Sequence, residues 1–240
     1  SARRDAHTAG AIGHRDGDAY RVMISRLIYW IAAHASGHPE AEAHYARHSR
    51  AFLQAGYLSA EMDAAVAWGD MLRRHGDLDD AAAQYAHALR VASEGEARAD
   101  VGPFLGAALC ERALGRPERA LDLVRAARAQ LTDGGPTWVA IVDLYEAWAQ
   151  SDTGGSVDQD AARDAASTLE ASGYLDRDVL RAYAGLAAAE VHTEVFEQAH
   201  ARGVATLEGF RRAEATRGPM PAYPDTDDGW AEADQERAAT

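Results

Sequence analysis

Two histidines stand at the spacing that a helix needs to hold a metal ion. His44 and His48 are four residues apart, which places both imidazoles on one face of a helix, and His34 and His38 precede them closely. No carboxylate or cysteine completes a signature such as HExxH around them. We therefore interpret these histidines as polar residues of an exposed helix face and predict no metal site. Because imidazole titrates near neutral pH, the alternative is a pH-sensing cluster.

Other residues with catalytic potential have a structural explanation. Asp79 and Asp80 open an expected helix, where acidic side chains favour the helix dipole. Glu146 lies close to Trp148 in the sequence and is a conceivable buried acid, but a position on an exposed helix face explains it equally well. The sequence contains neither a glycine-rich phosphate loop after a strand nor the text of a nucleophile elbow. We expect a protein that is not an enzyme and that needs no cofactor.

The composition excludes further classes of function. The net charge is −14, and a strongly acidic surface does not suit nucleic acid or an anionic membrane. Arginine is the basic residue throughout, because the sequence has no Lys, and it has no Asn either. No stretch reaches the roughly 20 apolar residues of a membrane span, and no signal-peptide pattern opens the chain. We expect a cytoplasmic location.

Glycines recur at a constant interval along the chain. Gly37, Gly76 and Gly115 follow one another at 39 residues, and a further 39 residues lead to Gly154. Each stands where one helical pattern of apolar residues stops and the next begins, as expected for a glycine that ends a helix in the left-handed conformation. The interval therefore predicts a repeating unit of two helices.

A second marker has the same period. The text Gly56-Tyr57-Leu58-Ser59 recurs as Gly173-Tyr174-Leu175-Asp176, 117 residues later, which is three times 39. Ser59 and Asp176 are suitable N-cap residues for the helices that follow. The pattern predicts an all-α fold with a helical domain at 18–217, preceded by a linker at 1–17 and followed by an acidic, proline-containing tail at 218–240. The expected helix pairs are 18–36 with 39–56, 58–75 with 77–94, 97–114 with 117–132, 137–151 with 157–172, and 175–191 with 194–216.

The unit from about Met62 to Gly95 resembles the tetratricopeptide repeat family. Its first helix carries Trp68-Gly69 and then Leu72, and its turn reads Gly76-Asp77-Leu78-Asp79-Asp80-Ala81. Tyr85 and Ala88 stand at the family's aromatic and small positions. The unit 101–132 follows the same pattern, with Glu111 where the family has an aromatic residue. The period of 39 is longer than the family's usual length of about 34. The resemblance implies a right-handed superhelical solenoid of about five antiparallel helix pairs.

The resemblance also implies a binding surface, because the first helix of each pair lines the concave side in this family. The function it implies is a non-catalytic scaffold or sensor domain that binds a protein or peptide within a bacterial regulatory or signalling protein. Packing between adjacent pairs is the alternative role for the apolar members of the surface. The residues implied are Leu27, Ile31, His34, Val66, Asp70, Arg73, Arg74, Leu105, Leu109, Arg112, Leu144, Trp148 and Tyr183.

The family's best-known peptide clamp uses Lys and Asn, which this chain lacks. We expect instead an apolar groove with scattered Arg, and a partner that offers aliphatic or aromatic anchors beside acid. The tail is one such candidate, since Tyr223 and Trp230 are surrounded by aspartates; it would dock on the array or on a neighbouring copy. Two alternatives stay open: a regulatory module that binds a small molecule in the solenoid's hollow, and a helical-repeat enzyme.

Overall fold

The computed structural model describes residues 2–34, 38–94, 101–131 and 134–216, and within these ranges the chain is all-helical, with no strand. The ten predicted helices are confirmed to within a few residues where they fall in the described ranges. The helices are α1 (Ala2–Asp16), α2 (Ala19–His34), α3 (Ala41–Gln54), α4 (Leu58–His75), α5 (Leu78–Glu94), α6 (Val101–Ala113), α7 (Pro117–Gln130), α8 (Pro136–Asp152), α9 (Gln159–Ser172), α10 (Arg177–Ala188) and α11 (Thr193–Ala215).

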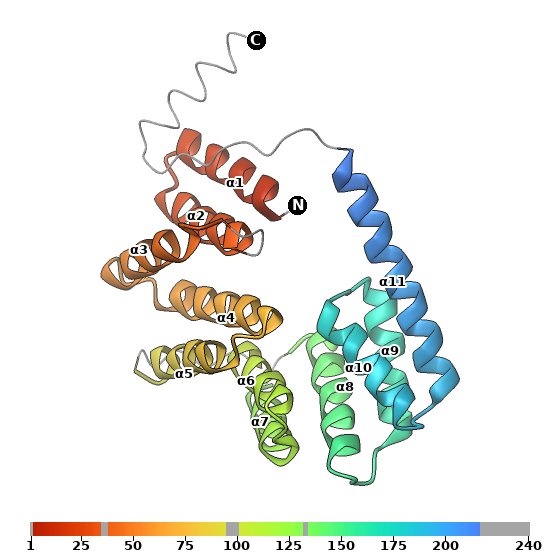
Figure 1. The fold of residues 1–240 in the computed structure, drawn as a ribbon. Helices are drawn as coiled ribbons and strands as arrows, with labels where there is room; N and C mark the ends of the chain where they lie inside the picture. The colour runs from red at the N-terminus through yellow and green to blue at the C-terminus, as the bar shows by residue number, and fades with distance from the viewer. Residues whose placement is uncertain (1, 35–37, 95–100, 132–133, 217–240) are drawn as a thin grey trace.

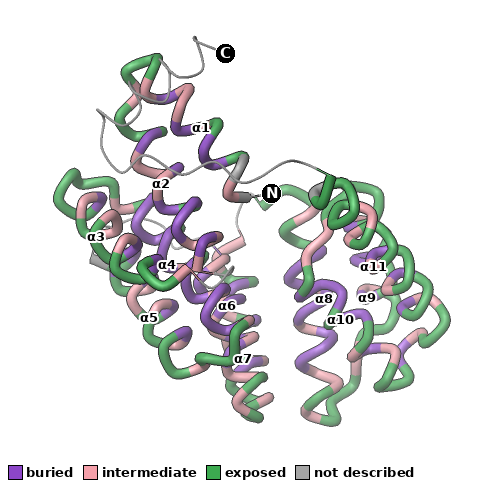
Figure 2. Tube along the Cα trace, turned by 45° about the horizontal axis from the view of Figure 1, so that its top comes forward, coloured by how far each residue is buried: buried purple, intermediate pink, exposed green. Residues whose placement is uncertain are grey.

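Successive helices pack side by side, and the even-numbered helices form a continuous row. Each helix contacts the next one along the chain, except that α9 and α10 do not touch, and α2, α4, α6, α8 and α10 also contact one another in that order. The chain runs from α1 to α7 and then returns through α8–α11, so that α1 and the end of α11 face each other across an opening (Figure 1). Figure 2 shows the buried residues on the sides where neighbouring helices meet.

The N-terminal segment is a helix where the sequence analysis expected a linker. Residues 2–16 form α1, which packs along α2 and buries Ala6 against Tyr29, Trp30 and other residues. The signal for this helix was in the sequence, because Gly17 lies 39 residues before Gly56. Both glycines have a positive φ, 70° and 77°. The expected tail at 218–240 lies outside the described residues.

Glycines close the helices as the 39-residue interval predicts. Gly76, Gly115 and Gly154 follow α4, α6 and α8, and all three have φ between 68° and 98°, a region that other residues avoid. Gly173 closes α9 with φ 69°. Gly37 lies outside the described residues.

The two predicted N-caps have different outcomes. Asp176 caps α10, because its Oδ1 accepts a hydrogen bond from the backbone N–H of Asp178 at 2.6 Å. Ser59 is not a cap: α4 begins at Leu58, and Tyr57 occupies the N-cap position without a side-chain hydrogen bond. An aromatic contact holds Tyr57 at this position, since its ring packs edge-on against Tyr20 with ring centres 5.2 Å apart. Asp158, which was not predicted as a cap, accepts a hydrogen bond from the backbone N–H of Ala161 and opens α9.

Tyr85 of α5 is the residue around which three helices pack. Its side chain is fully buried, and its ring contacts Gly69 of α4 and Gly106 of α6. A Cβ at Gly106 would overlap the ring, and one at Gly69 would lie 2.9 Å from it. Because neither glycine has a side chain, α4, α5 and α6 can pack closely around the Tyr85 ring.

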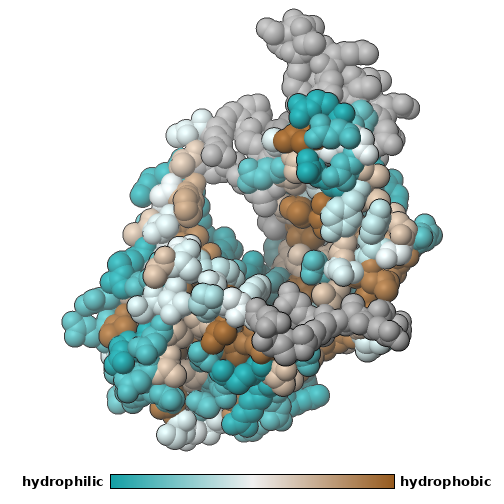
Figure 3. Space-filling model, turned by 180° about the vertical axis from the view of Figure 1, so that it is seen from behind, coloured by the Kyte–Doolittle hydropathy of each residue, from teal (hydrophilic) through white to brown (hydrophobic). Residues whose placement is uncertain are grey.

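None of the helices in the described part of the chain is long and apolar enough to cross a membrane. Seen from behind, the surface is mixed, with hydrophobic side chains on the α1–α4 side of the opening between the two arms of the chain (Figure 3).

Candidate functional site

A cavity of about 120 Å³ lies among the even-numbered helices, and we call it the α4–α10 cavity. Its walls come from α4, α6 and α8, together with the segment that leads into α10. The residues that line it are Val66, Asp70, Arg74, Gly102, Leu105, Gly106, Leu109, Trp138, Ile141, Tyr145, Tyr174, Asp176 and Asp178.

The cavity has an apolar wall and a charged wall. The apolar wall is the helix face of α6 with Leu105 and Leu109, and it continues onto Ile141 of α8. Gly102 and Gly106 stand one turn apart on the same helix and both line the cavity, and the Tyr85 ring packs against Gly106. The charged wall joins the C-terminal end of α4 to the N-terminal end of α10.

Arg73 of α4 reaches Asp178 of α10 across 105 residues of sequence. Its two terminal nitrogens donate to the two carboxylate oxygens at 3.0 and 2.7 Å, and its Nε donates to the hydroxyl of Tyr85 at 3.2 Å. Arg73 is 7% exposed and Asp178 3%. A bidentate pair is the geometry that best compensates two buried charges.

Arg74 extends the charged wall. Its Nη2 donates to Asp176 and to Asp178, at 3.0 Å in each case. Because Asp176 also caps α10, the start of that helix fixes the carboxylate that Arg74 contacts. Asp70 accepts hydrogen bonds from Arg73 at 3.3 Å and from the Tyr85 hydroxyl at 2.7 Å.

The pKa values of the two α10 carboxylates are shifted in opposite directions. Burial alone would raise the pKa of Asp178, but the hydrogen bonds and charges of Arg73 and Arg74 outweigh it and hold that pKa below its ordinary value. The pKa of Asp176 is raised, mainly by burial, and the charge of Arg74 does not fully offset this. Burial, with the charges of Asp176 and Asp70, also raises the pKa of Tyr174 to about 12. The Arg residues thus compensate Asp178 well and Asp176 less well.

Two aromatic residues of the cavity lining remain accessible to solvent. Trp138, in the first turn of α8, is 38% exposed, and Tyr174, in the link between α9 and α10, is 37% exposed. Large aromatic side chains with one face in solvent are typical anchors of protein interfaces.

The structure separates the predicted surface residues into four groups. Val66, Asp70, Arg74, Leu105 and Leu109 line the cavity together. Arg73 forms a buried ion pair with Asp178. The four residues Leu27, Leu144, Trp148 and Tyr183 are buried at 5% exposure or less, so they pack between helices and do not form a surface.

The remaining three predicted residues lie elsewhere. Arg112 lies over the ring of Trp148, 3.6 Å from its centre, and pairs with Asp152. Ile31 is half-buried against the core, and His34 contacts the ring of Trp68 edge-on.

Sequence reasoning did not assign Trp138, Tyr174 and Asp178 to the site. Tyr174 and Asp176 belong to the repeated text that marks the 39-residue period, and this was a signal that they stand at a junction between units. For Asp178 no such signal exists, because its partner lies 105 residues away.

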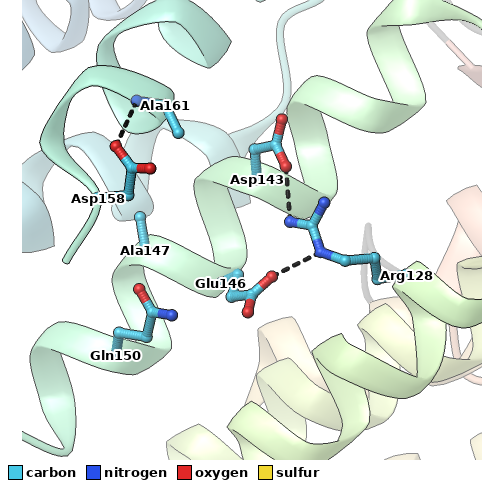
Figure 4. Close-up of a pocket in the computed structure, with 7 residues that line it drawn as sticks. All are labelled: Arg128, Asp143, Glu146, Ala147, Gln150, Asp158 and Ala161. Atoms are coloured by element: carbon cyan, nitrogen blue, oxygen red, sulfur yellow. Dashed lines mark hydrogen bonds and ion pairs between the residues drawn. The ribbon is translucent and has the colours of Figure 1, made fainter. Parts of the chain in front are cut away.

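A second cavity, of about 280 Å³, lies between α7, α8 and the start of α9. Arg128 donates hydrogen bonds to Asp143 at 2.6 Å and to Glu146 at 2.7 Å, and Figure 4 shows its guanidinium between the two carboxylates. Glu146 is therefore one partner of an ion-pair group, and its side chain is 18% exposed, between the buried acid and the exposed helix position that the sequence allowed.

One histidine of α3, His44, packs against an aromatic residue of α2. His44 stacks on Trp30 with ring centres 3.8 Å apart. Within the described ranges, no group of three or more His, Cys, Asp or Glu side chains is arranged to hold a metal ion.

No protein-family model matches the chain, and no curated protein matches its sequence. Its structure is similar to the crystal structure of BtubC (BKLC) from P. vanneervenii, with a TM-score of 0.56. The two share 18% sequence identity, over 94% of this chain and 95% of that chain. At this identity the likeness bears on the fold alone, and it extends over almost the whole of both helical chains.

Proposed function

We propose that this protein is a non-catalytic domain that binds a segment of another polypeptide, built as a tetratricopeptide-like solenoid of antiparallel helix pairs. The solenoid arrangement is supported by the 39-residue interval of the turn glycines, which extends back to Gly17. It is also supported by the contacts of each even-numbered helix with the next one. Stacked units of this kind bury a continuous core and leave a row of first helices facing one side.

The observation that carries the binding function is the α4–α10 cavity with its two exposed aromatic residues. Sites for drug-sized ligands measure roughly 300–1,000 Å³. A volume of about 120 Å³ is well below this range and suits a single side chain. The size therefore favours a peptide that inserts one anchor residue over a small molecule enclosed in the hollow.

The charged groups of the cavity have roles that suit binding better than catalysis. Arg73, Arg74 and Asp178 are joined in ion pairs, and Asp176 both pairs with Arg74 and caps a helix. Side chains held in this way maintain the shape of the cavity and set its electrostatic potential. We therefore propose a recognition site whose polar groups are fixed before the partner arrives.

The test is a selection of random 12-residue peptides displayed on phage, with the purified protein as bait. The recovered peptides are then measured by fluorescence anisotropy against Trp138→Ala and against the control Phe210→Ala. Phe210 is an aromatic residue on α11, 65% exposed, away from the cavity. Trp138→Ala should weaken binding by at least about 30-fold, as expected for an interface hot spot, whereas Phe210→Ala should leave it unchanged.

Both substitutions replace exposed side chains, so circular dichroism should show unchanged helix content. The proposal fails if no peptide is enriched, or if both variants bind the enriched peptides as tightly as the wild-type protein.

A further inference from the structure

Of the charged residues that line the α4–α10 cavity, three are aspartates and one is an arginine, Arg74. Three carboxylates, Asp70, Asp176 and Asp178, share the two guanidinium groups of Arg73 and Arg74. A third arginine, Arg181, contacts Asp178 at 3.2 Å from the exposed side of α10, where its own side chain is 54% exposed. The positive charges of the site therefore converge on Asp178.

The carboxylates that face solvent are the less compensated ones. The side chains of Asp70 and Asp176 are 31% and 30% exposed, whereas those of Arg73 and Asp178 are 4% exposed. A partner that enters the cavity thus meets two partly exposed carboxylates, Asp70 and Asp176, and one arginine of similar exposure, Arg74 (29%), which already bridges Asp176 and Asp178.

The negative charge of the aspartates also acts on two tyrosines of the lining. The pKa of Tyr145 is raised by burial and then by the charges of Asp178 and Asp176. The pKa of Tyr174 is raised by burial and then by Asp176 and Asp70. In both cases burial is the largest cause, the aspartates add to it, and an arginine acts in the opposite direction, Arg73 on Tyr145 and Arg74 on Tyr174.

The aromatic residues add a second preference for positive charge. The faces of Trp and Tyr rings attract Lys and Arg side chains, and Trp138 and Tyr174 are the accessible aromatic residues of this lining. The same rings also contact aliphatic or aromatic groups.

We infer that the partner's segment carries a Lys or Arg beside its apolar anchor residue. The anchor would lie against Leu105 and Leu109, and the basic group would lie near Asp176 and the ring of Tyr174. This inference rests on the proposed function and specifies its partner. It replaces the acidic partner expected from the sequence, because Arg73 and Arg112 are already paired with Asp178 and Asp152.

An acidic partner would have to compete with Asp178 for Arg73. That competition takes place in a site where both side chains are almost fully buried and bound through two parallel hydrogen bonds. A basic partner needs no such exchange, because Asp70 and Asp176 are reachable in the structure as it stands.

The test uses the peptides enriched by phage display whose binding depends on Trp138. Each is synthesised with its own sequence and with every Lys and Arg replaced by Ser. The unmodified peptides should carry a net positive charge, and the replacement should weaken binding to the wild-type protein by about 10-fold or more. Raising the NaCl concentration from 50 to 500 mM should weaken the basic peptides and leave the Ser forms nearly unchanged.

The matched protein variants are Asp176→Asn and Asp158→Asn. Both residues are N-caps of a helix, and Asn serves as well as Asp in that position, so both variants should fold. Only Asp176 lines the α4–α10 cavity. Asp176→Asn should weaken the basic peptides by about 3- to 10-fold, without effect on the Ser forms, and Asp158→Asn should change neither.

The outcomes separate the two proposals. If no enriched peptide depends on Trp138, both the binding function and this inference are wrong. If Trp138-dependent peptides are acidic or uncharged, or if Asp176→Asn and Asp158→Asn affect them equally, the cavity binds peptides but the inference about their charge is wrong.

Discussion

Arg73 and Asp178 form an ion pair in which both side chains are almost fully buried between helices. Removing two charges from water costs several kcal/mol per ion, and such a pair is stable only when its geometry and additional hydrogen bonds compensate the loss of solvent. Here the pair is bidentate, Tyr85 occupies the Nε of Arg73, and Arg74 occupies a further lone pair of Asp178. The pair therefore links α4 to α10 specifically, because no neutral arrangement of these side chains would satisfy the same atoms.

We predict that Arg73→Met lowers the free energy of unfolding by about 3 kcal/mol, the lower end of the range for an uncompensated buried charge, since Arg74 still contacts Asp178. The matched control is Arg202→Met, which removes a second bidentate pair, with Glu170, between side chains that are 57% and 39% exposed. It should cost at most about 1 kcal/mol. Urea denaturation followed by circular dichroism measures both; equal losses in the two variants would contradict the assigned role of burial.

At the scale of helices, Tyr85 sets the distance between α4, α5 and α6. Its ring occupies the space that a side chain at Gly69 or Gly106 would need. The α4–α10 cavity depends on this arrangement. Gly106 packs against the Tyr85 ring and belongs to the same short helix as Gly102 and Leu105, which also line the cavity.

We predict that Gly106→Ala destabilises the protein by about 1–3 kcal/mol, because its methyl group overlaps the Tyr85 ring. Gly209→Ala on α11 makes the same change where nothing lies within 4 Å of the added carbon. It should stabilise the protein by up to about 1 kcal/mol through helix propensity. Thermal denaturation compares the two, and a neutral or stabilising Gly106→Ala would show that α4–α6 can separate without cost.

The helices were predictable from the sequence, and five of the predicted surface residues line the cavity, but the long-range contacts that bury other predicted residues were not. Helix ends depend on local signals such as Gly76 and Gly115, which act within one turn. The side that a residue occupies depends on neighbours distant in sequence. The resemblance to the tetratricopeptide family implied Trp148 as a surface residue, with packing between helix pairs as the alternative, and the alternative holds: a Cβ at Gly185 of α10 would overlap its indole ring.

The same contrast between local signals and contacts distant in sequence explains the other differences between the predicted and the observed site. Arg73 was expected to contact a partner, and only the folded chain brings Asp178 to it from 105 residues away. The helix α1 was missed although Gly17 continues the glycine interval, because the interval was followed forward from Gly37 and not backward from Gly56.

In the whole molecule, two large apolar clusters share α6. One contains Leu27, Phe52 and Tyr85 from the N-terminal part, and the other contains Leu144 and Phe196 from the C-terminal part. Units that contact only their neighbours unfold with limited cooperativity. The link between Arg73 and Asp178 joins the two parts directly, so it should couple their unfolding.

We predict that the wild-type protein unfolds in urea in one transition, identical by circular dichroism and by tryptophan fluorescence. The double variant Arg73→Met with Asp178→Leu replaces the pair by apolar side chains and should recover much of the stability lost in Arg73→Met. Its transition should nevertheless broaden, with a lower dependence on urea, as the two parts unfold separately. An unchanged slope with coincident probes would show that packing through α6 is sufficient for coupling.

The ion pair between α4 and α10 has an evolutionary consequence as well. Genes that encode equal units gain and lose whole units by recombination, and the protein tolerates this when every junction stays the same. A change of one 39-residue unit between Gly76 and Gly173 would preserve the junctions but would move Asp178 away from Arg73. A change of this length within α5–α9 would therefore break the pair, whereas residues added before α4 or after α11 would leave it intact.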